Sequence, residues 1–148
     1  MNNLKSICGR LVHTMSVKFN DYSVQVIDKM NDRINAKLEE CAGLIEAQAA
    51  QNTRVDTGQT KNAWDHYVDE GEHIAYVGNP LENAIWEEFG TGEYALQGNG
   101  RKGGWKYVDD EGKGHFTMGK KPSRAFHKAY TSLKGKIIKA LENALKGM

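Results

Sequence analysis

One long apolar stripe, between residues 22 and 52, limits the folds open to this chain more than any other feature. Seven apolar residues recur there at steps of three and four: Ile27, Met30, Ile34, Leu38, Cys41, Ile45 and Ala49. Charged residues fill positions between them, no proline interrupts the run, and only Gly43 weakens it. The pattern predicts a long amphipathic helix, and its steps do not keep the strict heptad of a coiled coil.

The residues before this helix follow a different pattern. Between residues 10 and 19, one side of the chain carries Leu11, His13, Met15, Val17 and Phe19. This alternation is typical of a half-buried strand. Asn20 and Asp21 then offer a side-chain oxygen that can cap the helix. We expect residues 1–20 to form an N-terminal arm or strand and residues 21–148 to form a single domain.

A short turn and a hairpin are predicted after the long helix. Val55-Asp56-Thr57-Gly58 ends the helix, and Asp56 with Gln59 fits a capping box that opens a brief helical turn through Asn62. Two strand candidates follow at residues 63–69 and 73–78, and the turn-prone residues 70–72 separate them. The second strand is apolar enough on both sides for a central position in a sheet.

The second half of the chain is rich in glycine. Pro80 opens a short helix that runs to about Phe89, and Gly90-Thr91-Gly92 stops it. Residues 90–119 hold nine of the chain's 16 glycines. Because glycine loses the most backbone freedom on folding, we expect residues 93–104 to be a mobile loop. Residues 105–108 and 115–118 predict a hairpin, and a final amphipathic helix follows Pro122.

These elements predict an α+β fold. Long N-terminal and C-terminal helices pack on a small, mainly antiparallel sheet, and a short helix and a glycine-rich hairpin loop complete the domain. No apolar run approaches the length of about 18 residues that a membrane span requires.

The charge of the chain is unevenly distributed, although its formal net charge is only +1. Residues 56–93 carry nine acidic residues against Lys61, whereas residues 118–148 carry eight basic residues against Glu142. Two interpretations remain open. The two regions can partly neutralise one another within one subunit, which is the slightly preferred interpretation. Alternatively, the acidic part of one subunit meets the basic part of the next in a head-to-tail interface.

Few residues suggest catalysis. The five histidines show no metal-ligand spacing, the glycines form no phosphate loop, and neither cysteine lies in a nucleophile motif. Glu87 and His115 are the only candidates for a small hydrolase site, and adjacent Glu87 and Glu88 would point in different directions on a helix. We therefore expect no enzyme activity, no cofactor and no metal.

Nucleic-acid binding is the stronger alternative. Arg101 and Lys102 stand beside Trp105 in the glycine-rich segment, and mixtures of basic and aromatic residues can bind phosphates and bases. The basic C-terminal helix adds a lysine-rich face. The alternative function is thus a small nucleic-acid-binding module, although a solvated cationic helix is the preferred interpretation. If DNA is bound at all, we expect weak, sequence-independent contact with phosphates.

Three segments together resemble one protein family. They are the VDTG turn at residues 55–58, the run VGNPLENAIWEEFGTGEYA at residues 77–95, and GKKPSRAF at residues 119–126. Over residues 20–148 the chain is similar to the gene-product-ten-like neck proteins, minor capsid or tail components of tailed phages and prophages. Residues 1–19 are longer than is typical of that family and uncharacteristic of it.

The resemblance implies a structural virion protein of the head–tail junction that completes the tail and joins it to the head. It implies a ring, expected to be hexameric in the virion, around the DNA exit path, while the isolated subunit can remain monomeric. The expected neighbours are connector or adaptor proteins and tail-tube or tail-terminator proteins. The expected location is the virion neck, reached from the bacterial cytoplasm.

The residues that we expect at subunit or partner contacts come from the resembling segments and their basic neighbours: Asp56, Gly58, Trp86, Glu87, Glu88, Phe89, Gly90, Arg101, Lys102, Trp105, Lys120, Lys121, Arg124 and Lys128.

Overall fold

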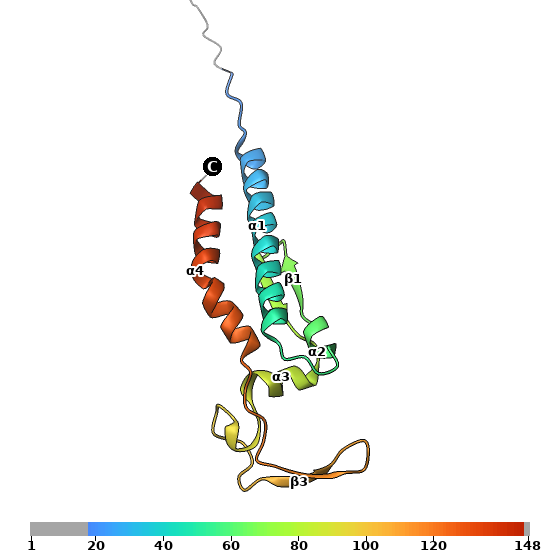
Figure 1. Ribbon diagram of the computed structural model, residues 1–148. Coiled ribbons are helices and arrows are strands. Elements are labelled where there is room, and N and C mark those ends of the chain that lie inside the picture. The colour runs from blue at the N-terminus through green and yellow to red at the C-terminus, as the bar shows by residue number, and fades with distance from the viewer. Residues whose placement is uncertain (1–17, 147–148) are drawn as a thin grey trace, which may run out of the picture.

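Two long helices that lie side by side organise the computed structural model, which describes residues 18–146 (Figure 1). They are α1 (Ser23–Asn52) and α4 (Ala125–Lys146), and both confirm the helices predicted from their apolar stripes. Most of the strand predicted over residues 10–19 lies outside the described residues, and residues 18–20 have no regular structure.

The buried hydrophobic side chains of the two long helices are small. Cys41, Ala42 and Ala49 of α1 and Ala125 and Ala129 of α4 are the buried hydrophobic residues of the described chain. Small residues allow two helices to approach closely, and larger apolar residues such as Leu38, Ile45 and Ile137 are half-buried. Burial raises the pKa of the Cys41 thiol, as expected for a cysteine that fills space in a core.

The first turns of α1 extend beyond α4. The two helices are antiparallel, because the Asn52 side chain at the end of α1 donates to the Ala125 carbonyl at the start of α4 (3.1 Å). With 30 residues against 22, α1 is longer by about 12 Å at 1.5 Å per residue. Val24 and Ile27 are therefore 68% and 54% exposed, although Ile27 belongs to the predicted buried stripe.

A two-stranded ribbon packs on the side of α1. It consists of β1 (Asp65–Asp69) and β2 (Ile74–Gly78), antiparallel with Tyr67 opposite Tyr76. The hairpin is confirmed, but the prediction of a central strand is wrong, because β2 pairs only with β1 among the described strands. Val68 and Ala75 face α1, whereas Tyr76 on the other side of the ribbon is 56% exposed.

A short turn, α2 (Gln59–Asn62), joins α1 to the ribbon and confirms the predicted helical turn. Its N-cap is Gly58 with φ +82°, a backbone conformation that favours glycine. The predicted capping role of Asp56 is wrong. No side chain caps α2, and the amide of Gln59 instead makes a long contact with the Thr57 hydroxyl (3.4 Å).

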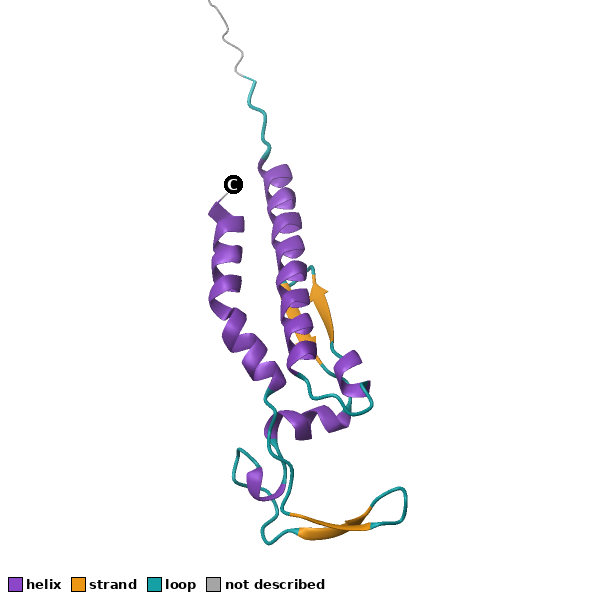
Figure 2. Cartoon of the chain, viewed as in Figure 1, coloured by secondary structure: helices purple, strands orange, loops and turns teal. Residues whose placement is uncertain are grey.

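The remaining elements form a second lobe below the two long helices (Figure 2). They are α3 (Glu82–Phe89), the 3-10 turn η1 (Gly92–Tyr94), β3 (Trp105–Val108) and β4 (Gly114–Thr117). Strands β3 and β4 form a separate antiparallel hairpin, as predicted from residues 105–118.

The α+β class is confirmed, and the strands form two separate two-stranded sheets instead of one small sheet. Among the described residues, no helix has both the length and the apolar character that a membrane span requires.

Candidate functional site

Large apolar side chains remain on the surface of the described chain. No large side chain is completely buried, and nine of the exposed ones lie in three places outside the long helices. These are the outer face of the β1–β2 ribbon (Tyr67, Ile74, Tyr76), one side of α3 (Ile85, Trp86, Phe89) and the β3–β4 hairpin (Tyr107, Val108, Phe116). Exposed apolar patches of this kind mark surfaces that bind other proteins.

The two most specific motifs of the sequence meet at the junction between the lobes. The amide of Thr91 donates to the carbonyl of Lys120 (2.9 Å), and the amide of Lys120 donates to the Thr91 hydroxyl (2.8 Å). The amide of Glu93 donates to the Met118 carbonyl (2.9 Å). We call this pairing of residues 90–93 with residues 118–122 the glycine clip.

Glycine is required in the clip because two backbones touch there. A Cβ atom on Gly92 would lie 2.2 Å from the Met118 carbonyl oxygen, and one on Gly119 would lie 2.1 Å from the Thr91 oxygen. Both residues also have positive φ, at +59° and +117°. Gly90, at φ +75°, approaches Pro122 and the Lys120 carbonyl in the same way. The glycines therefore fix the exit of the chain from α3.

Two adjacent glutamates of α3 hold the segment that leads into α4. The carboxylate of Glu88 accepts hydrogen bonds from the backbone amides of Phe126 and His127, each at 3.0 Å. These amides lie in the first turn of α4 and have no partner within the helix, so Glu88 caps α4 from another element. Glu87 forms an ion pair with Lys120, and its carbonyl accepts the amide of Ser123 (2.7 Å).

An open groove of about 670 Å³ lies beside the clip. Its apolar walls include Trp86 and Phe89 of α3, Leu96 of the loop and Trp105 of β3. The guanidinium of Arg101 lies over the Trp105 ring, 5.6 Å from its centroid, and adds one charge to the rim. The groove combines aromatic anchors with a cationic edge, which suits a protein segment as its ligand.

Most of the predicted contact residues meet at the clip or the groove. Those brought together there are Trp86, Glu87, Glu88, Phe89, Gly90, Arg101, Trp105, Lys120, Lys121 and Arg124. Asp56 and Gly58 lie at the α1–α2 turn, Lys102 is exposed in the loop, and Lys128 lies on α4. The roles of all these residues, inside and outside the clip and the groove, in subunit or partner contacts stay predictions.

The loop of residues 93–104 folds against the clip. The amide of Leu96 donates to the Phe89 carbonyl (3.0 Å), and the amide of Gly103 donates to the carboxylate of Glu93 (3.0 Å). A Cβ atom on Gly100 would lie 1.9 Å from the Gly92 carbonyl oxygen, so glycine is needed for packing there too. The predicted mobility of this loop stays a prediction.

The two residues considered for a hydrolase site lie in separate environments. Glu87 is engaged at the clip, whereas His115 stacks on Tyr107 and bonds to the carboxylate of Asp109 (2.6 Å). The His115 hydrogen bond lowers the pKa of Asp109, and the amides of Lys113 and Glu111 lower it further. Because the Asp109 carboxylate accepts the amides of Glu111 and Lys113, it closes the β3–β4 turn.

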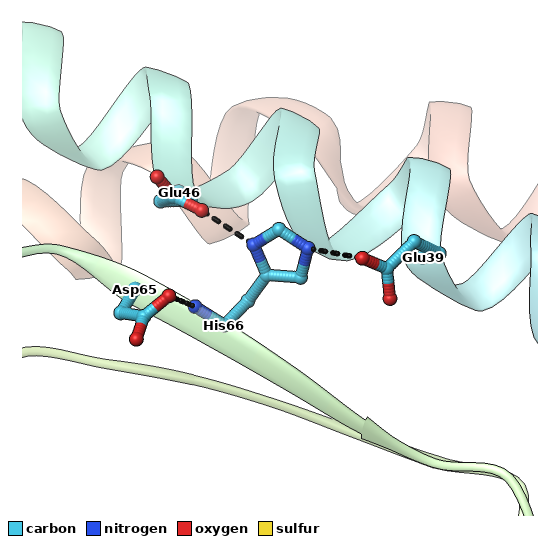
Figure 3. Close-up of polar contacts among 4 residues, drawn as sticks. All are labelled: Glu39, Glu46, Asp65 and His66. Carbon is cyan, nitrogen blue, oxygen red and sulfur yellow. Dashed lines mark hydrogen bonds and ion pairs between the residues drawn. The ribbon is translucent and has the colours of Figure 1, made fainter.

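Sequence reasoning missed a cluster around His66 that ties the β1–β2 ribbon to α1 (Figure 3). The imidazole lies between two glutamates of α1: its Nδ1 bonds to Glu46 and its Nε2 to Glu39 at 3.0 Å. Asp65 accepts the His66 amide (2.8 Å), and ligand atoms of Glu46, Asp65 and His66 lie within 4.8 Å of one another. The seven-residue spacing of the two glutamates places them on one helix face and was the available signal.

The His66 cluster predicts pH-dependent stability. The hydrogen bond from Glu46 is the main cause that raises the pKa of His66, and Glu39 adds to it against the effect of burial. The folded protein therefore holds this proton more tightly than the unfolded chain. Its stabilising contribution is complete below the ordinary histidine pKa of about 6.5 and is lost as pH rises through the folded-state value.

We expect the stability difference between the wild type and His66→Gln to shrink from pH 6 to pH 8, measured by urea unfolding. His127→Gln, an exposed change on α4, is the control and should follow the wild-type profile. Parallel profiles for the wild type and His66→Gln would contradict this assignment.

The comparison with protein families agrees with the resemblance drawn from the motifs. Residues 17–90 match the model of the HK97-gp10-like family, described as a tail component of bacteriophage HK97. The match spans half of the chain, from the start of α1 through α3, and is shorter than the span of the resembling segments. No curated protein and no solved structure matches the chain significantly. The chain belongs to the HK97-gp10-like family of structural bacteriophage tail components.

Proposed function

We propose that the protein acts at the head–tail junction of the virion, where its copies form a ring around the DNA exit path and complete the tail. Family membership supports a structural role in the phage tail. The ring, its expected hexameric number and the exact position in the neck belong to the proposal.

The exposure of large apolar side chains is the observation that carries the proposal. Among the described residues, the buried hydrophobic positions are four alanines and one cysteine, whereas Trp86, Tyr76 and Phe116 are at least half exposed. A protein of this size normally buries roughly two-thirds of its surface on folding. A subunit that gains much of its burial from neighbours fits this distribution.

The groove beside the clip is the surface that we assign to a neighbouring neck or tail protein, such as a connector or a tail-terminator subunit. Trp86 and Phe89 can act as anchors because they are half exposed and mounted on a helix that the clip holds in place. The groove also lies beside the loop of residues 93–104, which can adjust to a partner.

A complementation experiment tests this function. In a phage that lacks the gene, we expect filled heads and finished tails to accumulate separately, and the wild-type protein should restore joining. Trp86→Ala should fold but weaken partner binding by about 2 kcal/mol, roughly 30-fold, as is usual for an anchor residue. Negative-stain microscopy and infectious titre measure the outcome.

Val55→Ala, an exposed apolar change away from the groove, is the matched control and should complement fully. Virions that form normally without the gene, or that lack the protein in their mass spectra, would disprove the proposed function. Full complementation by Trp86→Ala would instead remove only the groove as the partner surface.

A further inference from the structure

We propose that copies of this chain join through two different faces: the outer face of the β1–β2 ribbon of one copy docks on the outer face of α4 of the next. The first is the acidic face, formed by Tyr67, Ile74 and Tyr76 with Asp65, Asp69, Glu70 and Glu72 at the ribbon ends. The second is the basic face, formed by Lys128, Gly135, Ile138, Lys139 and Lys146. This inference rests on the proposed function, because it names the contact by which the subunits assemble.

The two faces point away from each other. Helix α1 contacts α4 on one side and both strands of the ribbon on the other, so it lies between them (Figure 1). The carboxylates of the ribbon therefore lie on the opposite side of α1 from the lysines of the basic face. Among the described residues, the one ion pair that joins the acidic region 56–93 to the basic region 118–148 is Lys120 with Glu87 at the clip. The slightly preferred interpretation of the charge pattern is thus limited to that pair, and head-to-tail pairing gains support.

The acidic face is apolar at its centre and negatively charged at its ends. Tyr67 and Tyr76 are 64% and 56% exposed, and their rings stack with centroids 6.4 Å apart. The side chains of Glu70 and Glu72 are exposed at the hairpin turn, and no ion pair joins them within the described chain. A face of this kind requires a partner that is apolar in the middle and cationic around it.

The basic face of α4 meets that requirement. Lys128, Lys139 and Lys146 are separated by 11 and 7 residues, whole numbers of turns, so they share the side of α4 that faces away from α1. Ile138 is 45% exposed next to them. Within the described chain, Lys128 and Lys139 form no ion pair, and Lys146 reaches only Glu142 at 3.8 Å on its own helix.

Gly135 points independently to a neighbour at this face. Glycine in the middle of a helix is unfavourable, and a Cβ atom on Gly135 would meet no atom of residues 18–146 within 4 Å. No contact inside the subunit explains the absence of a side chain. A neighbouring side chain that lies against the helix backbone does, because only glycine leaves that surface flat. The stacked rings of Tyr67 and Tyr76 are flat groups of suitable size.

The dimensions of the two faces agree. Lys128 and Lys139 are about 16 Å apart along α4, with Gly135 between them. Asp65 and Asp69 are about 13 Å apart along β1, with Tyr67 between them. One oxygen of each carboxylate is already used inside the subunit, by the His66 amide at Asp65 and by the amides of Gly71 and Glu72 at Asp69. The tyrosines can therefore sit over Gly135 while the carboxylates at each end of the ribbon reach a lysine. Because the faces differ, the contact is head-to-tail and repeats from copy to copy, as a ring requires.

Charge reversal on one face at a time tests the contact. The first variant carries Glu70→Lys with Glu72→Lys, and the second carries Lys128→Glu with Lys139→Glu. Each should weaken self-association about tenfold or more in sedimentation at low salt. A mixture of the two should associate again with the variants alternating, because every contact then pairs either two original faces or two reversed faces. The variant with all four changes should associate again, since its charges are exchanged.

Cross-linking covers the case in which association is too weak for sedimentation. A carbodiimide should link Lys128 or Lys139 of one isotope-labelled copy to Glu70 or Glu72 of an unlabelled copy in concentrated wild-type protein. Cross-links that map elsewhere, or none between copies, would overturn the proposed contact. A mixture of the charge-reversed variants that stays monomeric while the wild type associates would do the same.

The Gly135→Ala variant separates assembly from folding. It should raise the Tm by about 3 °C because alanine favours the helix, and it should weaken self-association. Val55→Ala, an exposed change away from both faces, should leave association unchanged. Association by Gly135→Ala that equals the wild type would remove the close approach from the proposal.

The head–tail joining experiment tests the proposed function independently of the proposed contact between copies. Protein that is present in virions but cross-linked through other surfaces would refute this contact and leave the function in place. Protein that is absent from virions, but associates through these faces in solution, would refute the function and leave the contact in place.

Discussion

Gly92→Ala is expected to lower the free energy of unfolding by about 3 kcal/mol. The added methyl group would sit 2.2 Å from the Met118 carbonyl oxygen, where neither backbone can move without breaking the hydrogen bonds of the clip. Overpacking of this kind costs about 1–3 kcal/mol, and the φ of +59° adds about 1 kcal/mol for any residue with a Cβ atom. Urea unfolding measures the loss.

Gly98→Ala is the matched control for this variant. Gly98 belongs to the same segment and has φ +70°, but a Cβ atom there would meet nothing within 4 Å. Its substitution should therefore cost only the backbone term of about 1 kcal/mol. Hydrogen exchange at the amides of Thr91 and Glu93 should accelerate in Gly92→Ala and not in Gly98→Ala, because these amides donate across the clip. Equal costs for the two variants would show that the close approach at Gly92 contributes little.

The long helices could be predicted from the sequence because their signals are local. A residue's position on a helix follows from its neighbours three and four places away, and the predicted stripe of α1 includes Cys41 and Ala49, which are buried. The burial of Ala129 on α4 was not predicted. The exposure of Ile27 could not be predicted in this way. It depends on the different lengths of α1 and α4, and the two helices are far apart in the sequence.

The structural requirement for a glycine can depend on residues that are distant in the sequence. Nine glycines within residues 90–119 suggested mobility, yet Gly92 and Gly119 are 27 residues apart and lie against each other's backbone. A count of glycines cannot distinguish a flexible loop from a close contact of two chains. The same limit applies to His66, whose partners Glu39 and Glu46 lie 27 and 20 residues away on another element.

Whether a strand pairs with one neighbour or with two also cannot be predicted from its own sequence. Residues 74–78 are apolar enough for a central strand, but Ile74 and Tyr76 face outward because no third strand or second layer covers them among the described residues. An apolar strand that lacks a cover inside its subunit is the signal of a contact surface. The wrong prediction about β2 thus identifies the acidic face, where we place the neighbouring copy.

Glu88→Ala is expected to lower the free energy of unfolding by about 2 kcal/mol. The Glu88 carboxylate accepts the amides of Phe126 and His127, so its removal leaves two donors at the start of α4 without a protein partner. Loss of a helix N-cap costs about 1 kcal/mol, and hydrogen bonds to a charged acceptor are stronger than neutral ones. The negative charge also favours the N-terminal end of the α4 dipole.

Glu88→Gln and Glu82→Ala separate the causes of this loss. Glutamine retains one acceptor oxygen without the charge, so Glu88→Gln should cost about half as much as alanine. Glu82→Ala removes an exposed carboxylate from the first turn of α3 and should cost at most about 0.5 kcal/mol. Hydrogen exchange should accelerate at Phe126 and His127 only in the Glu88 variants. Exchange at these two amides that stays at the wild-type rate in Glu88→Ala would show that water or the preceding chain caps α4. Residues 88–92 (EFGTG) would then hold α3 to α4 through the glycine clip alone.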